Sequence, residues 1–543
     1  LPDSREIVIW AKGGLWRVNP FSGQATSIPF HVKDSREIRP ALRFAHEVAP
    51  DQFEVRQLRW VNVSPQGDKV VYSAMGHLYL RTLPDGVPRR LSSGEQHFEY
   101  FPKFSRDGKK LVYTTWHDEE LGSVRVRDLA SGKETILATG KGKFLDPVFS
   151  PDGKQVAYVK QPGGRLTSPW HGMQPGVYLA PIDNTGKPRL ITEDGSAPQF
   201  GLDARHLYVT RTQYPSEVDF HTDLVQIRLD TLAEQITVKS ELATDFALSP
   251  DGKQLAYTER FHAYVTPLPL AGKTLSIGKG SEGLPVKQFD VNGGDYLHWS
   301  GDGKQIHYAL GNQLFTHPIG ESFAWKAPAS GSDGATANTG SGANNPDTTP
   351  TPAGIAIGFR ASAARPTGVV VISGAKIVTM KGDEVIDNGR IVIENNRIQA
   401  IGKSSDIAIP KNAFEFEARG KTVIPGLVDV HWHGSMGEDG IIPQQSWVDY
   451  ASLAFGVTTV HDPSNDTSQI FTHSEMQRSG QITAPRIFST GTVLYGAKGN
   501  FSANVDSLDD ALMHLRRLQA GGAISVKSYN QPRREQRQQI LEA

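Results

Sequence analysis

The 543-residue sequence predicts a multidomain protein in which an all-β propeller precedes an α/β part built around a parallel sheet. Three observations support this prediction. A chain of this length exceeds what one hydrophobic core usually serves. A hairpin pattern recurs at intervals of 41 to 51 residues through the first part of the chain. In the last part, strand-like runs alternate with helix-like runs.

The repeated hairpin pattern is Ser-x-x-Gly-x-x-apolar-x-Tyr, and its first copy is SPQGDKVVY at 64–72. The glycine and its neighbouring aspartate favour a tight turn, and the alternation that follows predicts a strand with one buried face. The spacing is typical of four-stranded propeller blades of about 40 to 50 residues. Residues 13–23 resemble the strand after each hairpin, so we expect six or seven blades, with the chain starting partway through a seventh. The repeated tyrosines are Tyr72, Tyr113, Tyr158, Tyr208, Tyr257 and Tyr308.

This repeat resembles the TolB-like propeller repeat, which is related to the WD40 repeat, and we assign residues 1–326 to such a propeller. The repeated signature identifies a fold and not a function, because propellers serve binding, scaffolding and catalysis alike. We interpret the repeated Asp, Lys and Tyr residues as turn and strand-packing residues, since nothing in the repeats converges on one chemistry.

Residues 327–366 form the predicted flexible linker or long loop after the propeller. Within it, residues 328–353 hold no aromatic or large aliphatic side chain, so they cannot bury enough surface to offset the entropy of ordering. We therefore expect a domain boundary here.

The rest of the chain changes from strands alone to strands alternating with helices. Apolar, β-rich runs separated by polar turns occupy 367–424, and the alternation with helices occupies 425–543. Ser507 and Asp510 predict the start of one helix, because they form a capping-box pair ahead of a leucine stripe. AISVKSY, at 523–529, is predicted as a strand. The alternation indicates βα units around a parallel sheet.

The run VDVHWHG, at 428–434, is the most informative stretch of the sequence. Residues two apart on a strand share a face, so we expect His431 and His433 to point the same way and Trp432 to point oppositely. Two imidazoles about 7 Å apart along a strand can bind one cation, and zinc accepts neutral imidazole. An isolated His-x-His pair is also common on surfaces and in packing.

The segment from Val370 to Gly434 resembles the opening segment of the amidohydrolase superfamily, with imidazolonepropionase-like and prolidase-like members. It contains PGLVDVHWH at 425–433, which matches the Pro-Gly-Leu-x-Asp-x-His-x-His strand of that family. The resemblance implies a small β-sandwich over 367–424, and the first half of a metal-dependent (β/α)8 TIM barrel over 425–543.

The same resemblance implies a metal centre that holds one or two ions of zinc or a similar divalent metal. His431 and His433 would be its first two ligands. In binuclear members a carboxylated lysine at the end of the fourth barrel strand bridges the metals, and Lys527 lies on the fourth predicted strand. Burial destabilises an ammonium and so favours the neutral amine that reacts with carbon dioxide. The alternative is a strand-end lysine whose ammonium reaches solvent.

The family also uses histidines after the fifth and sixth strands and an aspartate after the eighth as general acid/base. Those positions would lie beyond residue 543, so no catalytic residue is assigned and we expect this chain alone to be inactive. Candidates for the substrate pocket are His461, Tyr495 and Tyr529, with a local turn network or packing as the alternative for each. His473 and His514 fall on predicted helices and are expected to be solvated.

Charge and composition limit the partners. Fifty-seven basic and 58 acidic residues leave a net charge of -1, which provides no field to concentrate nucleic acid. No apolar run reaches the roughly 20 residues that span a bilayer, so we expect a soluble protein without a membrane span. The absence of cysteine excludes disulfides and thiolate metal sites. The chain begins with Leu1, and we expect an exported or periplasmic location after removal of a signal.

The predicted function is hydrolysis of a carbon–nitrogen bond, in an amide, cyclic amide or peptide-like small molecule, by a metal-activated hydroxide. The alternative is a propeller-based binding or scaffold protein with a non-catalytic amidohydrolase half. Such a protein would bind a protein partner or self-associate through the propeller. A serine peptidase of the prolyl oligopeptidase type is a third option, and no Gly-x-Ser-x-Gly motif supports it.

Overall fold

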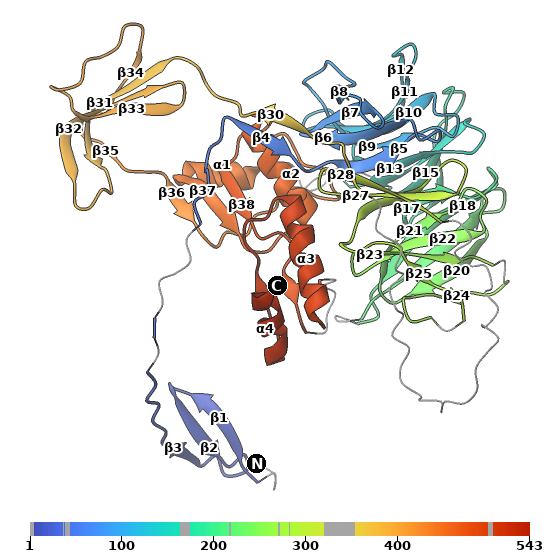
Figure 1. The fold of residues 1–543 in the computed structure, drawn as a ribbon, viewed down its shortest axis with the longest axis horizontal. Helices are drawn as coiled ribbons and strands as arrows, with labels where there is room; N and C mark the ends of the chain where they lie inside the picture. Colours follow the sequence, from blue (N-terminus) through green and yellow to red (C-terminus); the bar gives the residue numbers. More distant parts are fainter. Residues whose placement is uncertain are drawn as a thin grey trace. The chain divides into compact units, whose positions relative to one another are not determined.

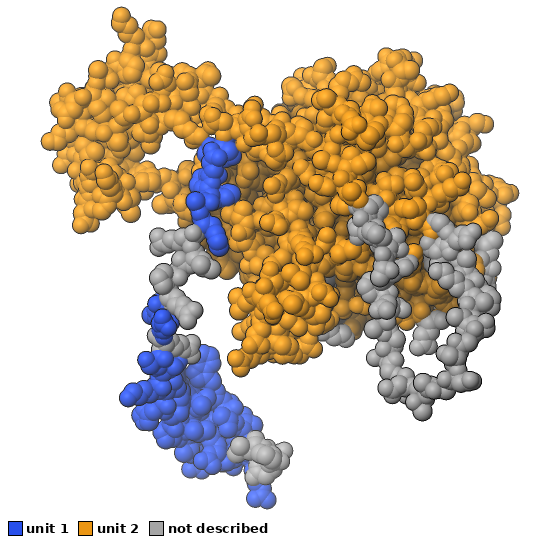
Figure 2. Space-filling view, viewed as in Figure 1, with its two compact units in different colours: residues 1–50 blue, residues 51–543 orange. Residues whose placement is uncertain are grey.

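The chain divides into two compact units, residues 1–50 and residues 51–543, in a computed structural model of the protein (Figure 1, Figure 2). Among the described residues, no helix is long and apolar enough to cross a membrane. The structure describes residues 5–35, 37–38, 44–162, 174–216, 219–269, 272–281, 283–319, 353–497 and 503–543.

The first unit contains one three-stranded antiparallel sheet. Lys12 and Gly13 join its first two strands with φ angles of 50° and 74°, the left-handed conformation that a two-residue hairpin turn requires. The strand within residues 13–23, which we expected in a seventh blade, belongs to this separate sheet. The strands are β1 (Ile7–Ala11), β2 (Gly14–Val18) and β3 (Ala25–Ile28).

The described part of the second unit contains six successive sheets, and the first strand of each sheet contacts the first strands of its neighbours. The first three sheets have four strands each. The first comprises β5 (Arg59–Val63), β6 (Lys69–Ala74), β7 (His77–Thr82) and β8 (Arg89–Arg90). The second comprises β9 (Phe98–Phe104), β10 (Lys110–His117), β11 (Leu121–Asp128) and β12 (Glu134–Gly140). The third comprises β13 (Lys143–Phe149), β14 (Gln155–Gln161), β15 (Gly176–Pro181) and β16 (Arg189–Thr192).

The remaining three sheets complete the ring, because the first strand of the sixth sheet contacts β5 of the first. The fourth sheet comprises β17 (Ser196–Phe200), β18 (His206–Gln213), β19 (His221–Arg228), β20 (Glu234–Ser240) and β24 (Leu275–Ser276). The fifth comprises β21 (Ala243–Leu248), β22 (Gln254–Glu259), β23 (His262–Pro267) and β25 (Lys287–Gln288). The sixth comprises β26 (Asp295–Trp299), β27 (Gln305–Leu310), β28 (Gln313–Pro318) and β29 (Ile355–Ala356).

A serine hydroxyl and an aspartate close the hairpin turn in five of the six copies of the repeat. Ser105 Oγ donates to Asp107 Oδ1 at 2.6 Å, and in the first copy Ser64 Oγ donates to Asp68 Oδ1 at 2.7 Å, although Asp68 follows the glycine instead of preceding it. The interpretation of the repeats as turn and packing residues is therefore confirmed. Five of the six repeated tyrosines are at most 2% exposed, namely Tyr72, Tyr113, Tyr158, Tyr257 and Tyr308.

The final part of the expected linker is ordered, so the prediction for 327–366 is wrong in this part. Residues 327–352 lie outside the described residues, but β29 completes the sixth sheet and β30 (Phe359–Ser362) pairs with β4 (Gln52–Val55). Tyr72 Oη donates to the carbonyl of Ile357 at 2.7 Å. The segment after residue 352 therefore supplies the last strand of the sixth sheet. Sequence composition cannot predict such pairing between residues far apart in the chain.

Residues 367–424 form one five-stranded sheet where the resemblance implied a sandwich. The sheet buries a small cluster that includes Ala375, Ile377 and Ile391, and it also exposes large side chains such as Phe414, which is 68% exposed, and Ile398, which is 65% exposed. The strands are β31 (Val369–Val378), β32 (Val385–Glu394), β33 (Arg397–Lys403), β34 (Phe414–Glu417) and β35 (Thr422–Val423).

The α/β segment, residues 425–543, contains a three-stranded parallel sheet and a separate two-stranded parallel sheet. The fourth predicted strand, 523–529, is reduced to its last two residues and pairs with β39, not with the larger sheet. The larger sheet comprises β36 (Leu427–Asp429), β37 (Val457–Asp462) and β38 (Arg486–Ser489), and the smaller one β39 (Leu494–Tyr495) and β40 (Ser528–Tyr529). The helices are α1 (Trp447–Ala454), α2 (Thr467–Arg478), α3 (Leu508–Gly521) and α4 (Arg534–Glu542).

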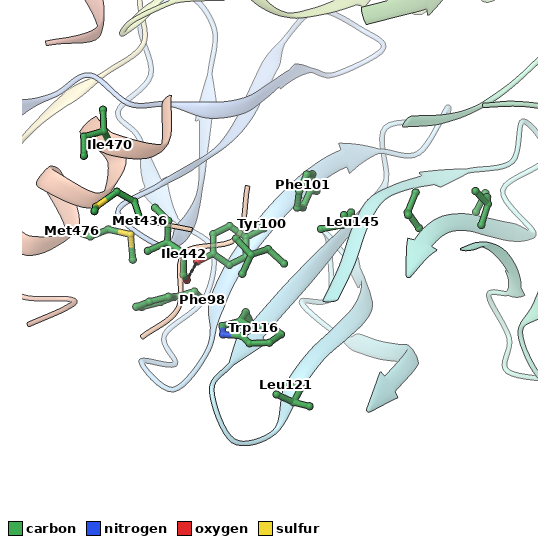
Figure 3. Close-up of a cluster of buried hydrophobic side chains, with 14 of the residues drawn as sticks. Phe98, Tyr100, Phe101, Trp116, Leu121, Leu145, Met436, Ile442, Ile470 and Met476 are labelled. Carbon is green, nitrogen blue, oxygen red and sulfur yellow. Dashed lines mark hydrogen bonds between the residues drawn. The ribbon is translucent and has the colours of Figure 1, made fainter. Parts of the chain in front are cut away.

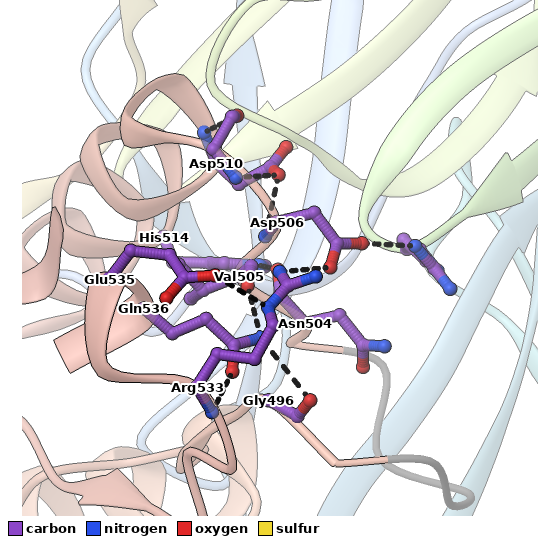
Figure 4. A network of polar contacts seen from close by, with 11 residues as sticks. Gly496, Asn504, Val505, Asp506, Asp510, His514, Arg533, Glu535 and Gln536 are labelled. Atoms are coloured by element: carbon purple, nitrogen blue, oxygen red, sulfur yellow. Dashed lines mark hydrogen bonds and ion pairs between the residues drawn. The ribbon is translucent and has the colours of Figure 1, made fainter.

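Side-chain hydrogen bonds hold the starts of α3 and α4 in place (Figure 4). The predicted capping box of α3 is confirmed: Ser507 Oγ accepts from the Asp510 amide at 3.1 Å, and Asp510 Oδ2 accepts from the Ser507 amide at 3.0 Å. Gln536 Nε2 donates to the carbonyls of Val505, at 2.9 Å, and Gly496, at 3.2 Å, and so holds α4 against the segment that precedes α3.

The prediction that His473 and His514 are solvated is wrong, because they are 0% and 1% exposed. His473 Nε2 lies 2.7 Å from Asp449 Oδ2 on α1, and His514 Nε2 lies 3.0 Å from the carbonyl of Asn504. His514 also packs edge-on against Phe261 of the ring of sheets, with ring centroids 5.7 Å apart. Neighbouring elements cover the helix faces that carry these histidines.

The α/β segment shares a hydrophobic cluster with the ring of sheets (Figure 3). Met436 and Ile442 lie in the same cluster as Phe98, Tyr100 and Trp116, and all five are at most 2% exposed. Tyr100 Oη donates to the carbonyl of Ile442 at 2.7 Å, which satisfies a buried hydroxyl across this contact.

Buried charges add polar contacts between the same two parts. Glu475 on α2 is 6% exposed, and its Oε1 accepts from the amides of Arg56, at 2.8 Å, and Gln57, at 3.3 Å. Burial raises the pKa of Glu475 to about 7, although the two amides and the guanidinium of Arg478 favour its charged form.

Glu475→Gln should therefore change how stability depends on pH. A folded-state pKa raised above its ordinary value of 4.5 gives stability that is present below pH 4.5 and lost as pH rises through 7. The loss is up to about 3 kcal/mol. We expect the wild-type unfolding free energy, measured in urea from pH 4.5 to 8, to fall relative to that of the variant. Glu241→Gln, at an exposed position, is the control. Parallel curves for wild type and Glu475→Gln would contradict the expectation.

Candidate metal centre

Strand β36 ends before the two histidines, so the prediction that they lie on the strand is wrong in this detail. Asp429 Oδ1 accepts from the His431 amide at 3.0 Å, and parallel pairing with β37 stops at Asp429. His431 and His433 therefore occupy the turn that follows the carboxyl end of β36. Active-site residues of parallel α/β folds collect at this end of the strands.

The two imidazoles nevertheless lie beside each other, as expected. The ring centroids of His431 and His433 are 5.1 Å apart, and both side chains are exposed. Trp432 is 9% exposed, and its amide donates to the carbonyl of His461 at 3.1 Å. A Cβ at Gly434 would lie 2.0 Å from the Trp432 ring, so the close approach of the indole requires glycine there.

A buried carboxylate faces the histidine pair from the end of β37. Asp462 is 0% exposed, and its Oδ1 lies 3.9 Å from His433 Nδ1. Its oxygens accept from the Ser464 amide and from Asn465 Nδ2, both at 2.8 Å, and Asn465 Nδ2 also donates to the carbonyl of Gly434 at 3.0 Å. The local turn network that we weighed for the neighbouring His461 is therefore present at Asp462, and it fixes a carboxylate beside His433. The sequence pair His-Asp at the end of GVTTV was the available signal.

His461 is half-buried beside the same turn. Its Nε2 lies 3.0 Å from Ser525 Oγ. Burial lowers the pKa of His461, Asp462 acts in the opposite direction, and His431 lowers it further. The imidazole therefore adds no positive charge against a bound cation at neutral pH.

Lys527 lies beside an aromatic ring at the start of β40. It precedes β40, its carbonyl accepts from the Leu494 amide at 2.9 Å, and its Nζ lies 4.8 Å from the centroid of the Tyr529 ring. The rings of Tyr495 and Tyr529 are 5.8 Å apart. The prediction that Lys527 lies within the fourth strand is wrong. The strand consists only of Ser528 and Tyr529, the two residues that follow Lys527.

The donor set at the histidine pair fits part of a zinc-type coordination sphere. His431 and His433 supply two adjacent imidazoles, and Asp462 supplies a buried carboxylate that can orient one of them. In the described part of the chain, no three His, Asp or Glu side chains are grouped so that they could hold a metal ion. The geometry thus provides an incomplete ligand set that is open to further donors.

Sequence comparisons find relatives for both parts of the chain. The chain is similar to a dihydroorotase of Geobacter sulfurreducens, 27% identical over 174 residues, which are 30% of this chain and 36% of that protein. It is similar to an imidazolonepropionase of Alkaliphilus metalliredigens, 27% identical over 172 residues, which are 28% of this chain and 40% of that protein. The chain therefore spans less than half the length of these relatives. No protein-family model matches the chain.

A shorter similarity concerns the Tol-Pal system protein TolB of Francisella tularensis, 37% identical over 62 residues, which are 11% of this chain and 14% of that protein. Among solved structures, TolB from Acinetobacter baumannii matches at 15% identity and a TM-score of 0.34, covering 57% of this chain and 75% of that one. The chain thus combines similarity to TolB with similarity to amidohydrolases.

His431→Ala and His433→Ala should each weaken binding of zinc to this chain by about tenfold or more, because each removes one of two adjacent imidazoles. Isothermal titration calorimetry with Zn²⁺ measures the affinity. His206→Ala, in β18, is the matched control and should leave the tightest site unchanged. Equal affinity and stoichiometry in all three variants and the wild type would show that the pair is not a metal site.

Proposed function

We propose that the protein is a metal-dependent hydrolase of carbon–nitrogen bonds in amides, cyclic amides or peptide-like small molecules. The observation that carries the proposal is the pairing of His431 and His433 after β36, beside His461 and Asp462 at the end of β37. The similarity to a dihydroorotase and an imidazolonepropionase supports it.

Each of these residues has a distinct task in the proposed reaction. When bound, zinc or a similar divalent metal, as one or two ions, supplies a hydroxide at neutral pH and polarises the scissile carbonyl. His431 and His433 hold the metal through neutral imidazoles. Asp462 restricts the rotation of the His433 ring, and neutral His461 avoids repelling the cation.

We extend the proposal to Lys527 as the carboxylated lysine of a two-ion centre, with Tyr495 and Tyr529 along the substrate pocket. Its support is the position of Lys527 directly before β40, half-buried beside the Tyr529 ring. An amine partly withdrawn from water is the form of lysine that can react with carbon dioxide.

Incubation with zinc and ¹³C-bicarbonate should therefore give a carbamate signal in the ¹³C NMR spectrum of the chain. We expect the signal to disappear in Lys527→Ala and to persist in Lys421→Ala, an exposed control. Wild-type protein that shows no carbamate signal when loaded with metal would contradict the bridging role.

The second candidate is a propeller-based binding or scaffold protein whose amidohydrolase-like part is not catalytic. The observation in its favour is that the described residues offer no group of three metal-ligating side chains. Such a protein would bind a protein partner or self-associate through the ring of sheets. Metal content of the purified protein separates the two candidates, since the hydrolase should retain metal.

Turnover is the direct test of the hydrolase. This chain, supplied with zinc, should show no measurable hydrolysis of a panel of dipeptides and cyclic amides, because two imidazoles leave a bound ion short of donors. A version extended through a complete barrel should hydrolyse at least one member of the panel, and His433→Ala in that version should abolish the activity. An inactive extended version that still binds metal would favour the binding protein.

A further inference from the structure

A small cavity of about 70 Å³ lies between the ring of sheets and the α/β segment, both of which belong to the second unit. Leu58, Leu310 and Asp295 line it from the side of the ring. Arg517 of α3 and Thr467 of α2 line it from the α/β segment. One water molecule in the liquid occupies about 30 Å³, so the cavity has room for a ligand of a few non-hydrogen atoms.

One edge of the Arg517 guanidinium is free to bind a ligand in this cavity. Arg517 is 4% exposed, and its Nε and Nη2 atoms are buried without a hydrogen-bond partner among the described residues. The guanidinium carbon lies 3.6 Å from the centroid of the Phe261 ring, a contact that restrains the side chain. Nε–H and Nη2–H point in parallel from the same edge, and such a pair donates two hydrogen bonds to one carboxylate. The free edge therefore fits a carboxylate.

The first turn of α2 presents further donors to the same cavity. Thr467 and Ser468 both line it, and amides in the first turn of a helix have no acceptor within the helix. Asp466 Oδ1 accepts from the Gln469 amide at 2.8 Å, so that amide already has a partner. The positive end of the helix dipole also favours a carboxylate at this place.

Two carboxylates of the chain line the cavity as well, and they determine which carboxylate ligand it accepts. Neither Asp295 nor Asp466 accepts from Nε or Nη2 of Arg517, although the charges of both oppose the lowering of its pKa by burial. Asp295 remains accessible, and its pKa, which burial raises to about 6, leaves it mostly ionised at pH 7.5. These carboxylates repel a ligand that is only negative and attract one that also carries an ammonium.

We propose that this cavity binds the head group of a free α-amino acid. The carboxylate of the ligand accepts from Nε and Nη2 of Arg517, and its ammonium donates to Asp295. A simple amine or a simple carboxylate matches only one of these two side chains. Ordered water is the competing occupant, because water can also donate and accept hydrogen bonds. The site uses no residue of the candidate metal centre, and it does not rest on the proposed hydrolysis.

Isothermal titration calorimetry of the full 543-residue chain at pH 7.5, without added metal, tests the proposal with three probes. The probes are glycine, acetate, which lacks the ammonium, and methylamine, which lacks the carboxylate. We expect glycine to bind about tenfold or more tightly than either analogue, because only glycine satisfies both the guanidinium edge and Asp295.

Three variants separate the contributions of the two side chains. Arg517→Lys keeps the positive charge but removes the two parallel donors, so it should weaken glycine binding by about tenfold or more. Arg516→Lys, at an exposed position on the same helix, is the matched control and should bind glycine as the wild type does. Asp295→Asn removes the charge that attracts the ammonium, so it should abolish the preference for glycine over acetate.

Glycine binding with the expected preference, lost in folded Arg517→Lys, supports the proposal. Thermal melting followed by circular dichroism reports whether each variant is folded. If Arg517→Lys does not fold, Asp295→Asn decides, since loss of the preference supports the proposal and its retention overturns it. Absence of saturable glycine binding, equal binding of acetate, or unchanged binding in folded Arg517→Lys would also overturn it and leave water as the occupant. None of these outcomes depends on whether the chain is a hydrolase.

Discussion

Burial of Trp432 between two exposed histidines is the interaction on which the candidate metal centre depends. The indole lies in the same hydrophobic cluster as Phe98 and Tyr100 of the ring of sheets. The Trp432 amide donates to the carbonyl of His461 in β37, and Gly434 leaves room for the indole ring. Because the indole occupies the interior, the imidazoles on either side must face outward, where a cation and a substrate have access. The orientation of the site thus follows from hydrophobic packing and needs no metal.

The same contact between the ring and the α/β segment carries buried charges. Glu475 accepts from backbone amides that precede the first sheet, and Arg517 stacks on Phe261, with its guanidinium carbon 3.6 Å from the ring centroid. Burial lowers the pKa of Arg517 to about 10, and Asp295 opposes that shift. A buried charge is tolerated only with partners. Separation of the two parts would remove those partners, so the ring and the α/β segment stabilise each other.

Local sequence rules succeeded where the relevant contacts are close in the chain. The capping box of α3, the repeated hairpin turns and the opposite directions of Trp432 and its neighbouring histidines all depend on residues within a few positions. These local rules failed where contacts between residues far apart in the chain determine the structure. The predicted strand at 523–529 is reduced to β40, which pairs with β39 and not with the larger sheet, and His473 is buried against Asp449 of α1. Helical periodicity cannot reveal such a neighbour.

The sequence by itself determined the repeated four-stranded sheets, the change to alternating strands and helices, and the neighbouring histidines of the candidate metal centre. These features arise from turn chemistry, periodicity and residue type, which act over a few residues. The tertiary structure decided that β29 completes the sixth sheet and that Asp462 faces His433. Each of these facts joins segments far apart in the chain, and their energy comes from burial and electrostatics that exist only after the chain has packed.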